Sequence, residues 1–135
     1  MFLQPKKSKF KKVKKGKLKN YNFKSNNELK FGEFGLKARQ SGTISSRQIE
    51  AARKAIVRKI KRKGKVWICI FPHTPVTNKP VESRMGKGKG SVDYWVAKVS
   101  KGTTIFEVCG VSSVLGLDAL ISGGKKLPVK TKFFD

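Results

Sequence analysis

Hydrophobic positions recur at helical spacing in one clear stretch, residues 45–63. The stretch opens with Ser45 and Gln48, whose Ser-x-x-Gln spacing is that of a capping box directly before a periodic run. Gly64 follows the last periodic residue and is expected to stop the helix. The pattern therefore predicts an amphipathic helix whose apolar stripe consists of Ile49, Ala52, Ile56 and Ile60.

Shorter runs predict β-strands on both sides of this helix. Residues 31–38 are punctuated by glycine and indicate a short strand or a turn. Residues 66–71 are continuously apolar, which predicts a strand buried on both faces or the central strand of a small sheet. Residues 91–110 alternate and turn at residues 100–103, which predicts a β-hairpin. Residues 127–134 alternate again and are expected to form an edge strand.

The segments between these strands complete the expected fold. A second, short helix is predicted over residues 112–122, with Ser112 or Ser113 as its cap. Regular pairing is not expected where prolines interrupt the chain, so an extended connection is predicted around Pro72, Pro75 and Pro80. Two helices on a mainly antiparallel sheet make a two-layer α+β architecture. A chain of 135 residues suits one such domain.

Residues 1–30 differ from the rest and are expected to form an extended basic segment, with residues 31–135 as the single α+β domain. No helical or strand period is sustained there, and like charges repel. Its aromatic residues Phe10, Tyr21 and Phe23 either stack on nucleic-acid bases or pack back onto the domain. Ten lysines precede the first acid, Glu28: Lys6, Lys7, Lys9, Lys11, Lys12, Lys14, Lys15, Lys17, Lys19 and Lys24.

The net charge of +24, from 32 Lys and Arg against 8 Asp and Glu, points to a polyanionic partner. Solubility alone requires a net charge of only about 2–8. Nucleic acid is the densest polyanion available, because neutralising its phosphates releases condensed counterions. The polar face of the first helix is a basic ridge that either contacts phosphates or is simply solvated: Arg47, Lys54, Arg58, Lys61 and Arg62.

The most distinctive segment is a loop in which glycine alternates with basic residues: Arg84, Met85, Gly86, Lys87, Gly88, Lys89 and Gly90. Alternate glycines allow the backbone to approach a surface closely and to offer its N–H groups. The spacing matches neither the Walker nucleotide-binding loop nor a dinucleotide-binding turn, so no small-molecule substrate is predicted. A flexible linker is the alternative, but the charge density favours a loop that inserts among RNA phosphates.

Catalysis, metal binding and membrane association are not expected. The eight acids form no close cluster, and His73 is the one histidine, in a proline-rich loop. Cys69 and Cys109 lie in apolar runs without Cys-x-x-Cys spacing, which predicts buried reduced thiols and no cofactor. No apolar run approaches the length of a bilayer span. The basic amphipathic helix also suits a membrane surface, but its alanine-rich stripe fits a compact core better.

Motifs along the whole chain resemble the bacterial-type ribosomal protein number sixteen of the large subunit. They begin with Gln4-Pro5-Lys6, Phe34-Gly35-Leu36-Lys37-Ala38 and Arg47-Gln48-Ile49-Glu50-Ala51-Ala52-Arg53. They continue through Gly64-Lys65-Val66-Trp67-Ile68, Phe71-Pro72, the loop 84–90, Tyr94-Trp95-Val96-Ala97 and Lys126-Leu127-Pro128-Val129-Lys130-Thr131.

The resemblance implies a structural constituent of the large ribosomal subunit that supports translation and is not an enzyme. Its implied partners are large-subunit rRNA, the tRNA in the aminoacyl (A) site near the peptidyl-transferase region, and neighbouring ribosomal proteins. Matched by motif, Arg84, Lys87 and Lys89 would contact rRNA or lie near tRNA. In bacterial members the arginine that matches Arg84 can be hydroxylated.

Two departures from the family pattern carry expectations of their own. The second helix has Leu117, Ile121, Gly123 and Gly124 where relatives are more charged or alanine-rich, so another protein is one candidate for its packing partner. The bias toward Lys, Asn, Phe and Ile indicates an A/T-rich gene. A mitochondrial ribosome is therefore predicted, with a plastid or the bacterial cytoplasm as alternatives.

Overall fold

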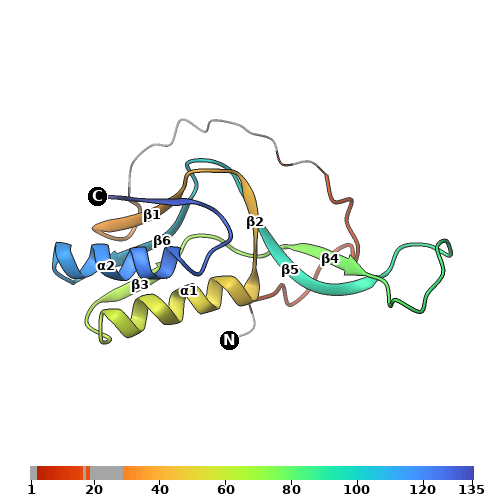
Figure 1. Cartoon of the computed structure of the whole chain (residues 1–135), viewed down its shortest axis with the longest axis horizontal. Coiled ribbons are helices and arrows are strands. Elements are labelled where there is room, and N and C mark those ends of the chain that lie inside the picture. Colours follow the sequence, from red (N-terminus) through yellow and green to blue (C-terminus); the bar gives the residue numbers. More distant parts are fainter. Residues whose placement is uncertain (1–2, 17, 19–28) are drawn as a thin grey trace.

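The computed structural model describes residues 3–16, 18 and 29–135, and these form an α+β fold (Figure 1). The elements follow in the order β1 (Phe34–Ala38), β2 (Gly42–Ser45), α1 (Ser46–Lys59), β3 (Lys65–Ile68), β4 (Thr74–Asn78), β5 (Ser91–Val99), β6 (Thr104–Cys109), α2 (Ser113–Gly124) and β7 (Thr131–Phe134). The predicted fold class is confirmed. The strands form two antiparallel sheets, however, where one was expected.

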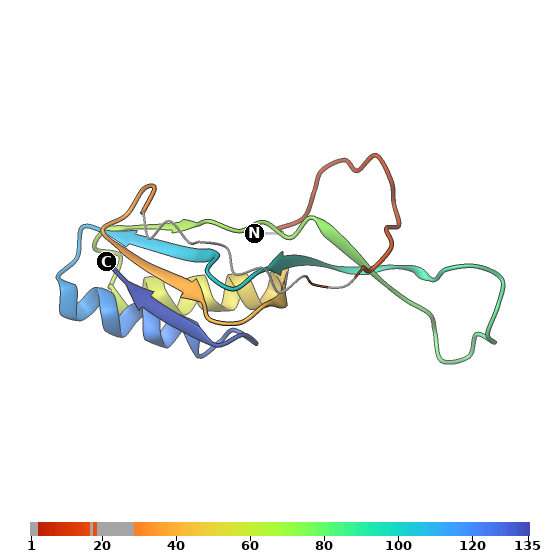
Figure 2. The ribbon, with the colours of Figure 1, turned by 90° about the horizontal axis from the view of Figure 1, so that it is seen from above.

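The four-stranded sheet has the order β3-β6-β1-β7, and the three-stranded sheet has the order β2-β5-β4. Figure 2 shows α1 and α2 side by side beneath one face of the four-stranded sheet. The core lies between that face and the two helices, and β5 adds residues to it from the other sheet. Its largest fully buried apolar side chains are Phe106, Leu36, Ile44, Ile49, Ile56, Ile60, Ile105 and Leu120.

Helix α1 begins as predicted and ends earlier. The Gln48 N–H donates to Ser45 Oγ at 3.3 Å, and the Ser45 N–H donates to Gln48 Oε1 at 2.9 Å, which completes the capping box. All four residues of the predicted apolar stripe are buried. The predicted end at Lys63 is wrong, because Lys61 and Arg62 adopt left-handed φ angles of 50° and 62° after the helix closes at Lys59.

The predicted hairpin at residues 91–110 is wrong, because β5 and β6 belong to different sheets. Strand β5 pairs with β2 and β4, whereas β6 pairs with β1 and β3. The turn at residues 100–103 exists, with the Thr103 N–H donating to the Ser100 carbonyl at 3.1 Å. It carries the chain from one sheet to the other. Alternation identified two strands correctly, but it contains no information on which strands pair.

Two further strand predictions are corrected at the sheet edges. Strand β3 is an edge strand with half-buried residues, not a central one, and the apolar run continues past Ile68 into a connection that packs on the core. Pro75 lies inside β4, opposite Trp95, so the proline-rich region does pair. Because β4 is also an edge strand, a proline without an N–H is tolerated there.

The C-terminal elements follow the prediction closely. Ser112 is the N-cap of α2, although its side chain makes no capping hydrogen bond, so packing stabilises the helix. Gly123 meets α1 so closely that a Cβ there would lie 2.5 Å from Ile56 Cγ1. The outward face of α2 leaves Val114, Leu117 and Ile121 exposed. Strand β7 is an edge strand as predicted, but it covers only Thr131–Phe134 of the predicted residues 127–134.

Candidate nucleic-acid interface

Strands β4 and β5 form a twisted ribbon that extends away from the two helices and ends in the loop of residues 79–90 (Figure 1). Residues 80–89 are all exposed, and Met85 is 99% exposed, so the loop contributes nothing to the core. Three consecutive residues, Gly86, Lys87 and Gly88, have positive φ angles of 99°, 53° and 86°. No heavy atom lies within 4 Å of where a Cβ would stand at either glycine. The predicted loop is thus an open basic tip.

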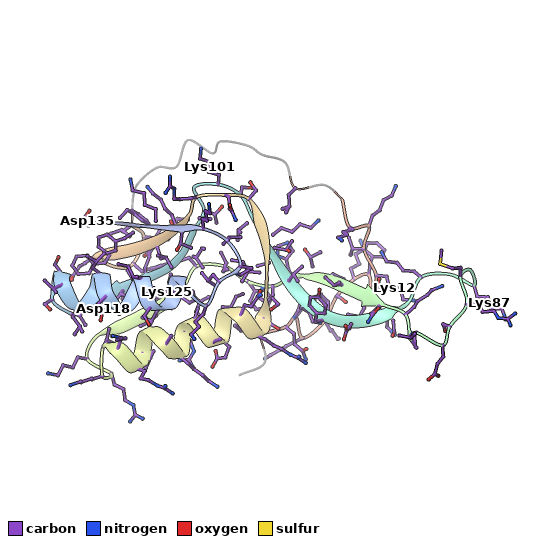
Figure 3. The ribbon with its side chains drawn as sticks, in the orientation of Figure 1. Lys12, Lys87, Lys101, Asp118, Lys125 and Asp135 are labelled. Carbon is purple, nitrogen blue, oxygen red and sulfur yellow. The ribbon has the colours of Figure 1, made fainter. Side chains whose placement is uncertain are left out.

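The N-terminal segment lies against this ribbon. The Lys12 ammonium donates to the Lys89 carbonyl at 2.8 Å, and the Lys89 ammonium donates to the Val13 carbonyl at 2.6 Å. The Lys98 ammonium on β5 donates to the carbonyl of Lys15. Figure 3 shows Lys87 at the end of the molecule far from Asp118 and Asp135, and Lys12 on the same side, closer to the body. Two segments that are 77 residues apart in sequence are therefore brought together.

The predicted lysines of the N-terminal segment that the structure describes are all exposed: Lys6, Lys7, Lys9, Lys11, Lys12, Lys14 and Lys15. The interpretation of Phe10 as a base-stacking residue remains a prediction; its ring is 67% exposed, with the Lys9 ammonium 5.8 Å from its centroid. The expectations for Lys17, Lys19, Tyr21, Phe23 and Lys24 concern residues outside the described part of the chain.

A second basic surface lies on α1. A groove of about 540 Å³ is lined by Arg53, Lys54, Val57, Arg58, Lys61 and Arg62, which includes four of the five predicted ridge residues. The fifth, Arg47, is exposed on the first turn of α1 and lines a separate hollow beside Asp93 and Tyr94. The predicted ridge therefore spans a basic groove near the end of α1 and a hollow near its start, and Lys54 lines both of them.

Few acids offset this charge in the part of the chain that the structure describes. Arg53 forms an ion pair with Glu50 at 2.7 Å, and their hydrogen bond lowers the pKa of Glu50. Lys59 pairs with Asp118 at 2.9 Å, and these two are the ion pairs found among the described residues. The four ridge residues of the groove take part in neither pair.

Backbone strain coincides with the predicted site. Among the described residues, the non-glycine positions with positive φ are Lys61, Arg62 and Lys87, and each was predicted to contact RNA. A left-handed backbone costs an ordinary side chain on the order of 1–3 kcal/mol when it sits in a sparsely populated region. Such strain gathers at functional sites, because binding requires a side-chain direction that folding alone does not favour.

Comparison with known proteins decides the family. A family model described as "Ribosomal protein L16p/L10e" matches residues 5–134. The chain belongs to this family. It is 54% identical over 131 residues to the large ribosomal subunit protein uL16 of Sinorhizobium medicae, a match that covers 97% of this chain and 95% of the relative. It is 53% identical, with the same coverage, to the proteins of that name from Rhizobium etli and Dichelobacter nodosus.

Membership of this ribosomal protein family confirms the resemblance and the prediction of a structural component rather than an enzyme. These three relatives are bacterial, so they lend no support to the predicted mitochondrial compartment. No group of three or more potential His, Cys, Asp or Glu metal ligands occurs in residues 3–16, 18 and 29–135. Within the same residues, no helix is long and apolar enough to cross a membrane.

The thiols of this family member differ from the prediction in burial. Cys69 and Cys109 are free, as expected, but both are only half-buried. Burial and the neighbouring Glu107 carboxylate raise the pKa of Cys69 to about 12. A hydrogen bond to Glu33 at 3.3 Å raises the pKa of Cys109. Both thiols therefore resist ionisation, which agrees with inert cysteines.

Two lysines that the sequence patterns did not single out hold the loop and the N-terminal segment in place. Lys79 donates to the Gly86 carbonyl at 2.5 Å and so braces the loop across its base. Lys98 holds the N-terminal segment and alternates along β5 with buried Ala97 and Val99. That alternation places Lys98 on the open face of the strand, so the sequence pattern could have identified it as a surface lysine. The contact with Lys15 depends on the folded path of the N-terminal segment, which no local pattern shows.

Proposed function

We propose that the chain is a structural constituent of the large ribosomal subunit that binds large-subunit rRNA beside the A-site tRNA and the peptidyl-transferase region. The observation that carries this proposal is the reciprocal pair of hydrogen bonds between residues 12–13 and Lys89. It holds the basic N-terminal segment against the glycine-rich loop, so both reach the same target. A narrow tip at the end of a ribbon can enter a crowded RNA centre that the helical body cannot (Figure 2).

Phosphate neutralisation supplies the affinity at this tip. The ammonium groups of Lys87 and Lys89 and the guanidinium of Arg84 are exposed and replace the condensed counterions of RNA. The glycines between them leave the backbone unshielded, so N–H groups can also approach phosphate oxygens. Such contacts are independent of base sequence, and they fix position and orientation.

The basic groove on α1 supports a second, separate contact with rRNA. It lies on the helical body, and the length of the β4–β5 ribbon separates it from the tip (Figure 1). Two contacts at different ends of the molecule define its orientation, which a single contact would not. Arg47, near the start of α1, is proposed to contact RNA between them.

The remaining expectations follow from membership in the family and from composition. Neighbouring ribosomal proteins are proposed as further partners. Residues 31–135 are proposed to be one domain, with residues 1–30 as its basic extension. The compartment is proposed from the excess of Lys, Asn, Phe and Ile alone: a mitochondrial ribosome, with a plastid or a bacterial cytoplasm as alternatives. Cell fractionation with organelle markers tests that assignment separately.

Directed hydroxyl-radical probing tests the proposed placement of the tip. Iron is tethered to a single cysteine at position 87 (Lys87→Cys) in a chain whose two native cysteines are replaced by serine, and the chain is assembled into large subunits. The expected result is cleavage of rRNA in the peptidyl-transferase region and of tRNA bound in the A site. The matched control is Lys101→Cys, an exposed lysine on the body (Figure 3). Assembled subunits in which position 87 cleaves neither RNA would contradict the proposal.

A further inference from the structure

The four-stranded sheet has a second face, which α1 and α2 do not cover. Trp67, Glu107 and Gly35 are neighbours across β3, β6 and β1 in the pairing register, so their side chains or Cα hydrogens point to the same face. Phe106 and Leu36 point the other way, into the core beneath the helices. The second face therefore carries the ring of Trp67 and the carboxylate of Glu107, and beyond them the buried ring of Phe134 lies opposite Gly35.

An aromatic pair stands on this second face. The ring of Phe31 lies over Trp67, with centroids 6.2 Å apart and planes inclined by 21°. Phe31 is nevertheless 61% exposed, so the ring face that points away from Trp67 is open to solvent. Burial does not explain a large aromatic side chain held in that position.

The backbone beneath Phe31 is fixed by a buried carboxylate. Glu107 is 1% exposed, and its Oε2 accepts from the N–H groups of Phe31 at 2.7 Å and Gly32 at 2.9 Å, while Oε1 accepts from Lys30 at 3.3 Å. At Gly32 the chain passes so close to β6 that a Cβ would lie 2.8 Å from the Val108 carbonyl oxygen. The ring is thus presented from a rigid support.

Two lysines come next to the pair in the chain or on the same strand. Lys30 is exposed, and its charge reaches Cys69 beside Trp67, where it opposes the rise in the thiol pKa. Lys65 is exposed on β3 and acts in the same way on Cys109. Of the acids that the structure describes on this side, Glu107 is buried against backbone N–H groups and Glu33 accepts the Cys109 thiol. Lysines around an open aromatic ring form the usual combination for unpaired nucleotides.

We propose that Phe31 and Trp67 form a stacking platform for an unpaired RNA base, with Lys30 and Lys65 engaging the adjoining phosphates. The assignment of RNA as the ligand rests on the proposed function, but the contact differs in chemistry from the phosphate contacts at the tip and the groove. Among the described residues, Glu107 lies beneath the platform, but backbone N–H groups occupy its carboxylate, so it does not read a base edge. Stacking is therefore expected to tolerate any base.

The test uses the full chain with Trp95→Phe, which leaves Trp67 as the reporter of this face, since the sequence has two tryptophans. Its fluorescence is titrated with a uridine dodecamer and with an abasic dodecamer of equal charge, at a salt concentration that weakens phosphate contacts. We expect the uridine strand to quench Trp67 and the abasic strand not to do so. Phe31→Ala is expected to weaken this binding by about 5- to 150-fold, the range for losing one base–aromatic stack.

Phe31→Leu is the matched control, because it keeps an apolar side chain and removes only the aromatic face. It should weaken binding nearly as much as Phe31→Ala, with an unchanged circular dichroism spectrum for both variants. Equal effects of the uridine and abasic strands on Trp67 fluorescence would overturn the platform. Full binding of the uridine strand by Phe31→Leu would also overturn it, because an apolar contact with another protein does not require an aromatic ring. Failure of the unaltered chain to bind RNA of any kind would instead reject the proposed function.

Discussion

Replacing Glu107 with glutamine is expected to destabilise the free protein, although the side chain lies outside the basic surfaces. Glu107 is 1% exposed and accepts three backbone hydrogen bonds from residues 30–32. Glutamine has the same shape but only one acceptor oxygen. That oxygen can serve Phe31 and Gly32, which share Oε2 in the native chain, and the amide group then faces the Lys30 N–H as a second donor.

The cost follows from the type of bond lost. A hydrogen bond to a charged group contributes about 1.5–3 kcal/mol. The variant Glu107→Gln should therefore lower the free energy of unfolding by about 1.5–3 kcal/mol at pH 7. Burial raises the pKa of this carboxyl, but the three N–H bonds, with a smaller contribution from the Cys69 thiol, outweigh burial and the net pKa is lowered.

The direction of the pKa shift fixes the pH dependence. A carboxyl whose folded-state pKa lies below its unfolded value, about 4.3, stabilises the fold fully above that pH. Its contribution is lost as the pH falls through the folded-state pKa. The difference in stability between the native chain and Glu107→Gln should therefore be constant from pH 7 to about 5 and shrink at lower pH.

Urea unfolding followed by circular dichroism between about pH 7 and pH 3 measures this difference. The matched control is Glu82→Gln, which removes the same charge from an exposed position in the loop and should change stability by less than about 0.5 kcal/mol. A Glu107→Gln variant as stable as the native chain at pH 7 would show that the carboxylate does not support residues 30–32. A difference in the free energy of unfolding that stays the same when the carboxyl is protonated at low pH would show this as well.

Two further variants test the basic surface on α1. Arg62→Gly should stabilise the free protein by about 0.5–1 kcal/mol, because it removes a left-handed penalty of about 1–2 kcal/mol, while the greater freedom of the unfolded chain costs roughly 0.5–1 kcal/mol. The same variant should weaken rRNA binding, since it removes a positive charge. Thermal melts and filter binding measure the two effects, and a destabilised variant would contradict the strain argument. Lys54→Gln with Arg58→Gln should flatten the plot of log affinity against log salt by about 1.4–1.8. Lys125→Gln with Lys126→Gln removes the same charge elsewhere, and an equal change in that pair would show that the groove has no special role.

Local patterns predicted the local features of this fold. The start of α1 followed from Ser45 and Gln48, because a capping box is completed within four residues. The end of α1 did not follow, because Lys61 and Arg62 take up a conformation that their residue types disfavour. A sequence pattern records intrinsic preferences, so a strained segment is the place where it fails.

Non-local features were beyond the reach of the patterns. Strands β5 and β6 were both identified, but their assignment to different sheets depends on partners at residues 42–45 and 34–38. The loop 84–90 and the N-terminal lysines were each selected from composition, whereas their contact through Lys12 and Lys89 depends on the folded path of the chain. Phe31 was missed as a site residue because nothing local shows that Glu107 holds it outward.

Sedimentation of a cell lysate tests whether the excess of positive charge on this chain serves to bind ribosomal RNA. The tagged full chain is followed through a sucrose gradient at moderate salt, with and without ribonuclease. We expect it to travel with large subunits and to leave that fraction when the RNA is digested. A chain found mainly at the top of the gradient in untreated lysate, free of RNA, would show that RNA is not its normal partner.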